Sequence, residues 1–173
     1  MQSHSPANGG QPGVPHRYDG MPAVTRLARA CPPENILLDA PVESPNQLFE
    51  YAALHLQRRY GLAAERIRTE LMKREQLGST GLGQGVALPH ARVGGVGAAL
   101  GLFVRALYPF GFDAPDGKPV GEFLLLVMPE EDDREHLELL ADAARFLGKR
   151  QFRLAARAAQ TPDEIAALMQ GTR

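Results

Sequence analysis

The chain has a single cysteine, no excess of either charge and no long apolar run. Cys31 alone cannot form an intrachain disulfide, which is compatible with a reducing compartment. The 19 basic residues against 20 acidic ones create no global field that would draw the chain to nucleic acid or to an anionic membrane. Apolar runs such as 123–128 are far shorter than the roughly 18 residues that indicate a membrane span. We therefore expect a cytoplasmic protein with no nucleic acid partner and no membrane insertion.

The first 20 residues have few apolar side chains and are rich in Pro, Gly, Ser, Asn and Gln. Such a composition cannot repay the entropy cost of ordering, so we expect a disordered, flexible tail over residues 1–20. No basic segment followed by an apolar stretch opens the chain, which argues against a secretory signal. A single domain is expected over residues 21–173, and Met21 is a candidate for the natural start.

Capping patterns predict the helices and apolar runs predict the strands. Ser44, Pro45 and Gln47 combine an N-cap, a proline at the first helical position and a capping-box amide, so a helix should run to about Tyr60. The other expected helices are a short one around Leu27 before two prolines, one through Ile67 and Leu71 ending near Gly78, one from Asp132–Asp133 to Gly148, one over 152–159, and one capped by Thr161. The expected strands are 98–106 and 121–128, and residues 36–38 form a further short apolar run.

The stretch REQLGSTGLGQGVALPHAR at residues 74–92 joins a helix end, a glycine-rich loop and a histidine. Glycines can take positive φ angles and turn backbone N–H groups toward one point, as an anion site requires. Ser79 and Thr80 add hydroxyl groups, and Arg74 adds a planar fork of charged donors. Ordinary tight turning explains the glycines equally well, and a solvated cation at a helix end would explain Arg74.

His90 follows Pro89, so the chain before it should be extended and should hold the ring beside the glycine loop. A neutral imidazole is plentiful at neutral pH and can carry a phosphoryl group as a phosphoramidate. An isolated histidine is more often structural, and it is the adjoining loop that favours the carrier role. His136 recurs with Leu140, Ala143 and Leu147 at helical spacing, on or beside the buried stripe of its helix.

Other chemistries fit these residues less well. The glycines from 78 to 83 have P-loop-like spacing but are followed by Gln84 and Gly85, without the Lys-Ser/Thr pair that contacts nucleotide phosphate and magnesium. No Cys/His cluster accompanies His90 and His136, so no metal site and no cofactor are expected. Cys31 lies against two prolines and lacks a nucleophile signature, which argues against a thiol hydrolase.

The 74–92 stretch resembles, nearly residue for residue, the phosphorylation-site signature of the fructose/mannitol-type enzyme IIA domains of the bacterial phosphotransferase system. Residues 109–120 look like a second block of that family, and the resemblance covers roughly residues 21–169. The opening segment 26–39 is similar to the stand-alone nitrogen-regulatory branch. Gln84 favours the same branch, because mannitol-type members carry an acidic residue at the matching position.

The resemblance implies an α/β fold in which helices flank a mixed β-sheet. It also implies that His90 accepts phosphate from a histidine phosphocarrier protein, that Arg74 and His136 line the pocket in supporting roles, and that no metal is needed. Ser79, Thr80 and Gln84 are the expected phosphate-binding residues. No IIB or IIC domain accompanies the chain, so sugar transport by this chain alone is not expected.

Three functions stay open at this point. The first is a phosphocarrier of the nitrogen-regulatory phosphotransferase system that regulates target proteins through its phosphorylation state. The second is a sugar-uptake IIA that passes phosphate to a separate fructose- or mannitol-type IIB. The third is a non-enzymatic binding module whose partners change when His90 is phosphorylated.

Overall fold

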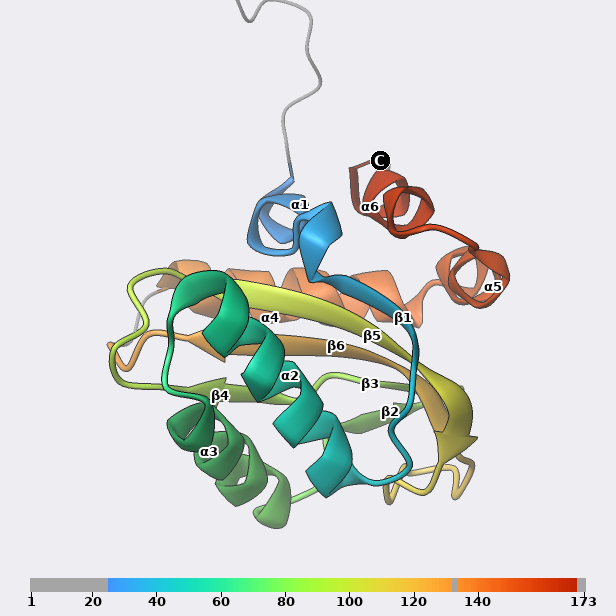
Figure 1. The fold of residues 1–173 in the computed structure, drawn as a ribbon. Coiled ribbons are helices and arrows are strands. Elements are labelled where there is room, and N and C mark those ends of the chain that lie inside the picture. The colour runs from blue at the N-terminus through green and yellow to red at the C-terminus, as the bar shows by residue number, and fades with distance from the viewer. Residues whose placement is uncertain (1–24, 132–133, 171–173) are drawn as a thin grey trace, which may run out of the picture.

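The computed structural model describes residues 25–131 and 134–170. Within these residues a six-stranded mixed sheet lies between two layers of helices (Figure 1). This confirms the expected α/β architecture. The strands follow the order β1 (Ile36–Ala40), β5 (Leu100–Phe110), β6 (Val120–Met128), β3 (Val86–Ala87) and β2 (Gly81–Gly83), and β4 (His90–Arg92) pairs with β6. Antiparallel pairing joins β5 to β6 and β2 to β3, whereas β1 runs parallel to β5, and β3 and β4 run parallel to β6.

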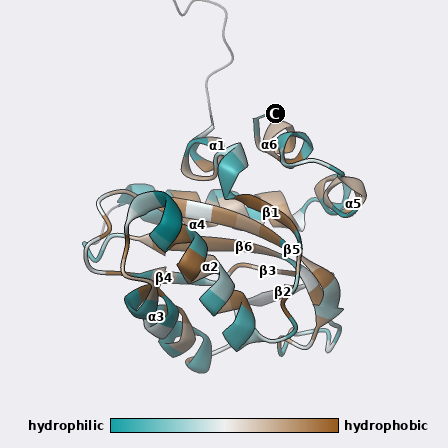
Figure 2. Ribbon diagram, viewed as in Figure 1, coloured by the Kyte–Doolittle hydropathy of each residue, from teal (hydrophilic) through white to brown (hydrophobic). Residues whose placement is uncertain are grey.

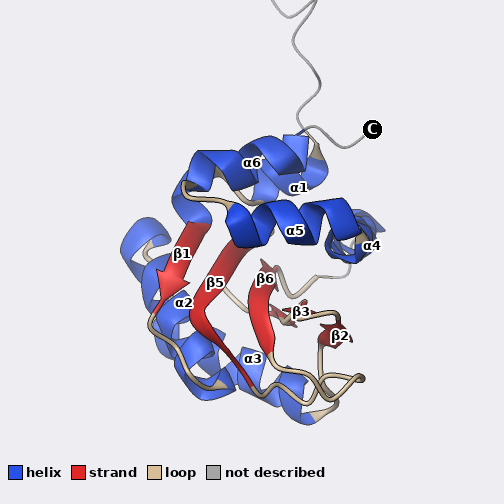
Figure 3. Cartoon of the chain, turned by 90° about the vertical axis from the view of Figure 1, so that its right-hand side faces the viewer, coloured by secondary structure: helices blue, strands red, loops and turns tan. Residues whose placement is uncertain are grey.

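The helices divide between the two faces of the sheet, as the side view in Figure 3 shows. One face is covered by α2 (Pro45–Tyr60) and α3 (Ala64–Gln76). The other carries α1 (Arg26–Ala30), α4 (Arg134–Gly148), α5 (Arg150–Ala158) and α6 (Pro162–Gln170), with a short 3₁₀ turn, η1 (Pro33–Asn35), leading into β1.

The start of α2 has the N-cap Ser44 and the proline at the first helical position that the sequence predicts, but the capping-box side chain of Gln47 bonds one residue earlier than expected. The Ser44 hydroxyl accepts a hydrogen bond from the Gln47 amide at 3.2 Å, and the Gln47 side chain accepts one from the Glu43 amide at 2.9 Å. The first bond satisfies one of the amides that the first turn leaves unpaired, and the second ties the residue before the N-cap to the helix. The helix ends after Tyr60 at Gly61, which takes the left-handed conformation with φ 69°.

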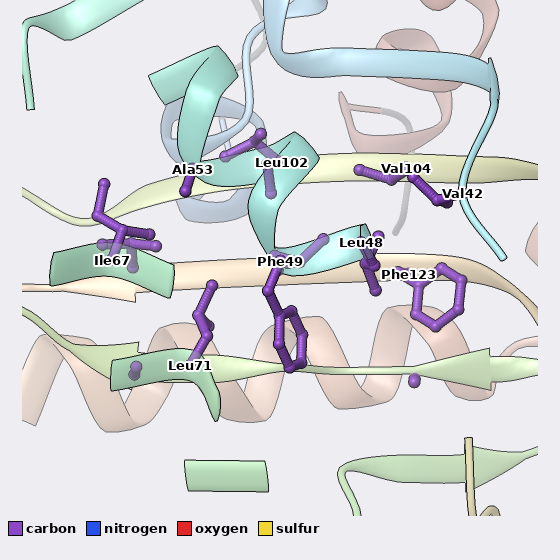
Figure 4. Packing of buried hydrophobic residues seen from close by; sticks show 14 of the residues in the cluster. Val42, Leu48, Phe49, Ala53, Ile67, Leu71, Leu102, Val104 and Phe123 are labelled. Carbon is purple, nitrogen blue, oxygen red and sulfur yellow. The ribbon is translucent and has the colours of Figure 1, made fainter. Parts of the chain in front are cut away.

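Alternation along the central strands produces two hydrophobic clusters, one on each face. Leu102 and Val104 of β5 face α2 and α3, while Phe103 between them faces the opposite layer of helices. Figure 4 shows the first cluster, in which Phe49 and Phe123 pack with aliphatic side chains of the sheet and of α3. Figure 2 shows the same arrangement as apolar strands between helices that are polar on their outer sides. Both faces of β6 are covered, so the strand reads as one continuous apolar run.

Two segments differ from their predicted form. The strand predicted over 98–106 runs from Leu100 to Phe110. Its pairing with β6 is irregular after Arg105 and resumes where Phe110 lies opposite Val120, which extends the strand. The loop expected at 78–85 contains the hairpin of β2 and β3, whose strands are too short to have a recognisable period. The expected tail over residues 1–20 and the helix start at Asp132–Asp133 lie outside the described residues.

Candidate active site

The last turn of α3 directs two side chains toward the chain that follows it. Arg74 donates from Nη1 to the Gly78 carbonyl at 2.9 Å, so its guanidinium group lies beside the turn that ends the helix. Glu75 accepts hydrogen bonds from the Thr80 amide at 2.9 Å and from the Thr80 hydroxyl at 2.7 Å. The end of α3 is therefore tied by side chains to residues 78–80.

The two hydroxyl groups expected to bind phosphate both have partners within the protein. Ser79 donates to the Phe112 carbonyl at 2.8 Å and accepts from the Gly81 amide at 3.1 Å. Thr80 is buried, with 6% of its surface exposed, and its hydroxyl donates to Glu75. Both residues brace the glycine segment in this state, and phosphate binding by either of them stays a prediction.

The glycine segment folds into a β-hairpin and not into an open anion-binding loop. Gln84 and Gly85, with φ of 58° and 79°, form its two-residue turn, as the twist of a tight hairpin requires. The Gln84 amide donates to Asp116 at 2.9 Å, and its carbonyl accepts from Arg157 at 2.5 Å. Gln84 lines a cavity of about 620 Å³ together with Arg105 and Glu122, and this cavity does not include His90. The phosphate-binding role predicted for Gln84 stays a prediction.

The glycines of the segment do not all use the positive φ angles that are open to them. Positive values occur at Gly78, Gly83 and Gly85, whereas Gly81 has none. A Cβ atom at Gly81 would lie 3.0 Å from the backbone Cα of Ala114, tighter than most real Cβ contacts. The small size of this residue, rather than its conformational freedom, lets the hairpin pack against the 109–120 block.

His90 opens β4, where the backbone pairs in parallel with Leu126 of β6. Its Nδ1 atom lies 2.9 Å from the Leu88 carbonyl oxygen, an acceptor only, so Nδ1 carries the proton and donates this bond. The Nε2 atom of the neutral ring then keeps its lone pair. Burial is the main cause that lowers the pKa of His90 below its usual value, and the positive charges of Arg74 and Arg92 add to it, against the Leu88 hydrogen bond and the charge of Glu75.

His90 and Arg74 line the same cavity, which has a volume of about 380 Å³. It lies between the end of α3 and strand β4, and Leu140 of α4 and Met128 of β6 contribute apolar walls. Its charged lining consists of Lys73, Arg74, Arg92 and Glu70. Lys73 pairs with Glu70 at 3.3 Å, and Arg92 donates to the Glu131 carbonyl at 3.0 Å. The arrangement presents a neutral nucleophilic nitrogen in a mainly cationic surrounding, which suits a dianionic group.

His136 lines a different cavity of about 400 Å³, with Arg26, Arg29 and the 97–100 segment. Its Nδ1 atom is buried and has no hydrogen-bond partner among the described residues. Leu140, one turn later on the same side of α4, does reach the His90 cavity. The structure thus brings the helix of His136 to the site without placing the imidazole in the His90 cavity, and direct support of the phosphoryl group by His136 stays a prediction.

The described part of the chain also has no group of three or more His, Cys, Asp or Glu side chains placed to hold a metal ion. None of the helices in residues 25–131 and 134–170 is long and apolar enough to cross a membrane.

A family profile described as the phosphoenolpyruvate-dependent sugar phosphotransferase system, EIIA 2, matches residues 29–171. The chain belongs to this EIIA type-2 family. The match includes the hairpin, His90 and all of α4, and it confirms the family predicted from the signature at residues 74–92. As a type-2 EIIA, the chain is a phosphotransfer component.

Relatives of this EIIA include proteins of the nitrogen-regulatory branch. A nitrogen regulatory protein of Pseudomonas aeruginosa is 35% identical over 141 residues, which cover 81% of this chain and 92% of the relative. The crystal structure of the nitrogen regulatory protein IIA-Ntr from Neisseria meningitidis superposes with a TM-score of 0.79 at 41% identity, covering 84% of this chain and 99% of that one. The mannitol IIA of Escherichia coli has the same fold, with a TM-score of 0.66 at 18% identity over 79% of this chain and 96% of its own.

Three features of this EIIA site were missed by reasoning from the sequence. The Leu88 carbonyl that fixes the His90 ring is a backbone group, which side-chain patterns do not reveal. Arg92 and Lys73 share the cavity with Arg74, although only Arg74 was singled out. Glu75 was not identified, because its contact with Thr80 depends on how the chain turns after α3.

Proposed function

We propose that this EIIA is a phosphocarrier of the nitrogen-regulatory phosphotransferase system. His90 accepts a phosphoryl group from a histidine phosphocarrier protein, and the phosphorylation state of His90 regulates the binding of partner proteins. The observation that supports this proposal is the Nδ1 hydrogen bond to the Leu88 carbonyl, which leaves the Nε2 lone pair available in the cavity shared with Arg74.

The transfer needs no further reactant. The P–N bond to the donor histidine breaks as a new P–N bond forms at Nε2 of His90, the donor nitrogen regains its lone pair, and the proton on Nδ1 of His90 stays in place. Negative charge spreads over the phosphoryl oxygens during the transfer. The guanidinium groups of Arg74 and Arg92 line the same cavity and stabilise that charge. Neutral His90, maintained by burial, is the reactive form.

Incubation with enzyme I, a histidine phosphocarrier protein and phosphoenolpyruvate tests the proposal. Wild-type protein should gain one phosphate by intact mass, and NMR of ¹⁵N-labelled protein should locate the phosphorus on Nε2. His90→Gln should gain none. His55→Gln is the matched control, because His55 contacts Asn35 at 3.2 Å and does not line the His90 cavity. Failure of wild type to be labelled by any cognate donor would refute the carrier role.

The regulatory part of the proposal has its own test. Phosphate adds negative charge beside the cavity and so changes which surfaces can dock there. Pull-downs should recover one set of partners with unphosphorylated wild type and with His90→Gln. Phosphorylated wild type should recover a different set. Identical partner sets would refute regulation by phosphorylation state. Rapid onward transfer to a sugar-specific IIB would replace the regulatory role with sugar uptake.

A further inference from the structure

Glu75 is connected to His90 through a continuous series of hydrogen bonds. Its two carboxylate oxygens accept from the Thr80 amide and hydroxyl, at 2.9 Å and 2.7 Å. The Thr80 carbonyl accepts from the Leu88 amide at 3.0 Å, and the Leu88 carbonyl accepts from Nδ1 of His90 at 2.9 Å. Each bond fixes the group that makes the next one.

The middle of this series is shielded from water. Thr80 and Leu88 are 6% exposed each, so their hydrogen bonds have little competition from solvent. On the far side of Leu88, the Pro89 carbonyl accepts from the Leu126 amide at 2.9 Å, which anchors the segment to β6. The position of the Leu88 carbonyl is therefore determined on one side by the sheet and on the other by the contact between Thr80 and Glu75.

We propose that Glu75 is a positioning residue for phosphoryl transfer, which acts through Thr80 and Leu88 to fix the orientation and tautomer of the His90 ring. This inference rests on the proposed carrier role of His90. The tautomer matters because a proton on Nε2 would remove the lone pair that attacks phosphorus, whereas a proton on Nδ1 leaves it available. The Thr80 hydroxyl, with its proton donated to Glu75, then contributes to transfer through the backbone and not as a phosphate ligand.

Glu75 also adds a negative charge to a surrounding that is otherwise mainly cationic. The charged groups around His90 are Lys73, Arg74, Glu70 and Glu75 from α3 and Arg92 from β4. Arg74 and Arg92 lower the pKa of His90, and Glu75 opposes them. A substitution that removes only the charge of Glu75 can thus be separated from one that removes its hydrogen bonds.

Two variants make this separation. Glu75→Gln keeps an oxygen for the Thr80 amide and offers an NH₂ group to the Thr80 hydroxyl, so both contacts survive without the charge. Glu75→Ala removes the contacts as well. Glu65→Ala is the matched control, because Glu65 lies in the first turn of the same helix and pairs with Arg68.

The first readout is the ring of unphosphorylated His90, followed by ¹⁵N NMR across a pH titration. Wild type and Glu65→Ala should show the proton on Nδ1. Glu75→Gln should keep that tautomer with a lower pKa, and Glu75→Ala should show a mixture of both tautomers. A folded Glu75→Ala protein with an unchanged tautomer overturns the proposal. Should this variant not fold, Thr80→Val decides in the same way, because it removes the hydroxyl contact and keeps the Thr80 amide bond.

The second readout is the single-turnover rate of phosphoryl acceptance from a phosphorylated phosphocarrier protein. Misplacement of a reacting group costs up to about 100-fold in rate, so Glu75→Ala should lose about 10- to 100-fold and Glu75→Gln should recover most of that loss. Equal losses in the two variants would mean that charge, not positioning, is responsible, and would overturn the proposal. The ring measurement needs no donor, so failure of the wild type to accept phosphate refutes the carrier role separately from the tautomer result.

Discussion

At the scale of single residues, His90 combines a partly buried ring with an Nε2 atom that keeps its lone pair, and this determines the pH dependence of its reaction. Burial and neighbouring cations place its pKa below the ordinary value of 6.5. We therefore expect the single-turnover rate of acceptance to stay constant as the pH falls through 6.5, and to decline only at the lower folded-state pKa. NMR titration of the ring, compared with the pH–rate profile after correction for the donor, measures this. A midpoint at or above 6.5 in both would contradict it.

The lowered pKa of His90 also makes the stability of the folded protein depend on pH. Because the unfolded chain binds a proton at a higher pH than folded His90 does, protonation favours unfolding. The contribution of His90 to the free energy of unfolding is therefore fully present above pH 6.5, and it is lost as the pH falls from 6.5 through the lower pKa of the folded state. His55, whose pKa burial also lowers, acts in the same direction.

Cys31, in contrast to His90, is made unreactive by its buried position. It is 1% exposed, and burial raises its pKa to about 12. The thiolate is the reactive form, so we expect native protein to resist iodoacetamide at neutral pH and denatured protein to react fully. Mass spectrometry after timed alkylation measures this. Rapid alkylation of the native protein would show that the packing of α1 against the sheet opens readily.

At the scale of elements, the hairpin of β2 and β3 depends on close contact with the 109–120 block. Gly81→Ala places a methyl group 3.0 Å from the Ala114 backbone, and overpacking of this kind costs about 1–3 kcal/mol of stability. Gly95→Ala is a useful comparison, since nothing lies within 4 Å of its Cβ position and only its φ of 87° opposes the change. Chemical denaturation measures both. A Gly81→Ala protein as stable as the wild type would show that the block moves freely.

Most helices and the two central strands could be predicted from sequence, because capping residues and apolar runs are local signals. Ser44 and Gln47 predicted the start of α2, and the run at 123–128 predicted most of β6. The contacts that organise the site are not local. The approach of Gly81 to Ala114, and the fact that Gln84 and His90 line different cavities, depend on how β3 and β4 pair with β6. The sequence identified His90 and Arg74 as neighbours of one cavity, but not the role of Glu75 in holding the ring.

At the scale of the whole molecule, the sheet holds the site between two layers of helices, and each layer contributes to it. Arg74 comes from α3 on one face, Leu140 comes from α4 on the other, and β4 carries His90 at the sheet itself. The position of the His90 cavity therefore depends on both hydrophobic clusters. A structure built in this way should unfold as one unit, because loss of either cluster exposes a face of β6.

This cooperativity can be tested with one leucine from each cluster. Leu56 of α2 and Leu147 of α4 are both fully buried, on opposite faces of the sheet. Each Leu→Ala change should lower the free energy of unfolding by about 2–5 kcal/mol, and the effects should add in the double variant, because the two side chains belong to separate clusters. Leu154→Ala, at a side chain 51% exposed, is the control and should change stability by less than about 0.5 kcal/mol. The chain has no tryptophan, so circular dichroism and the NMR signal of His90 should be followed together. Coincident transitions for the two probes are expected in every variant, and a Leu147→Ala protein that loses helical signal before the His90 signal changes would show that the two layers unfold separately.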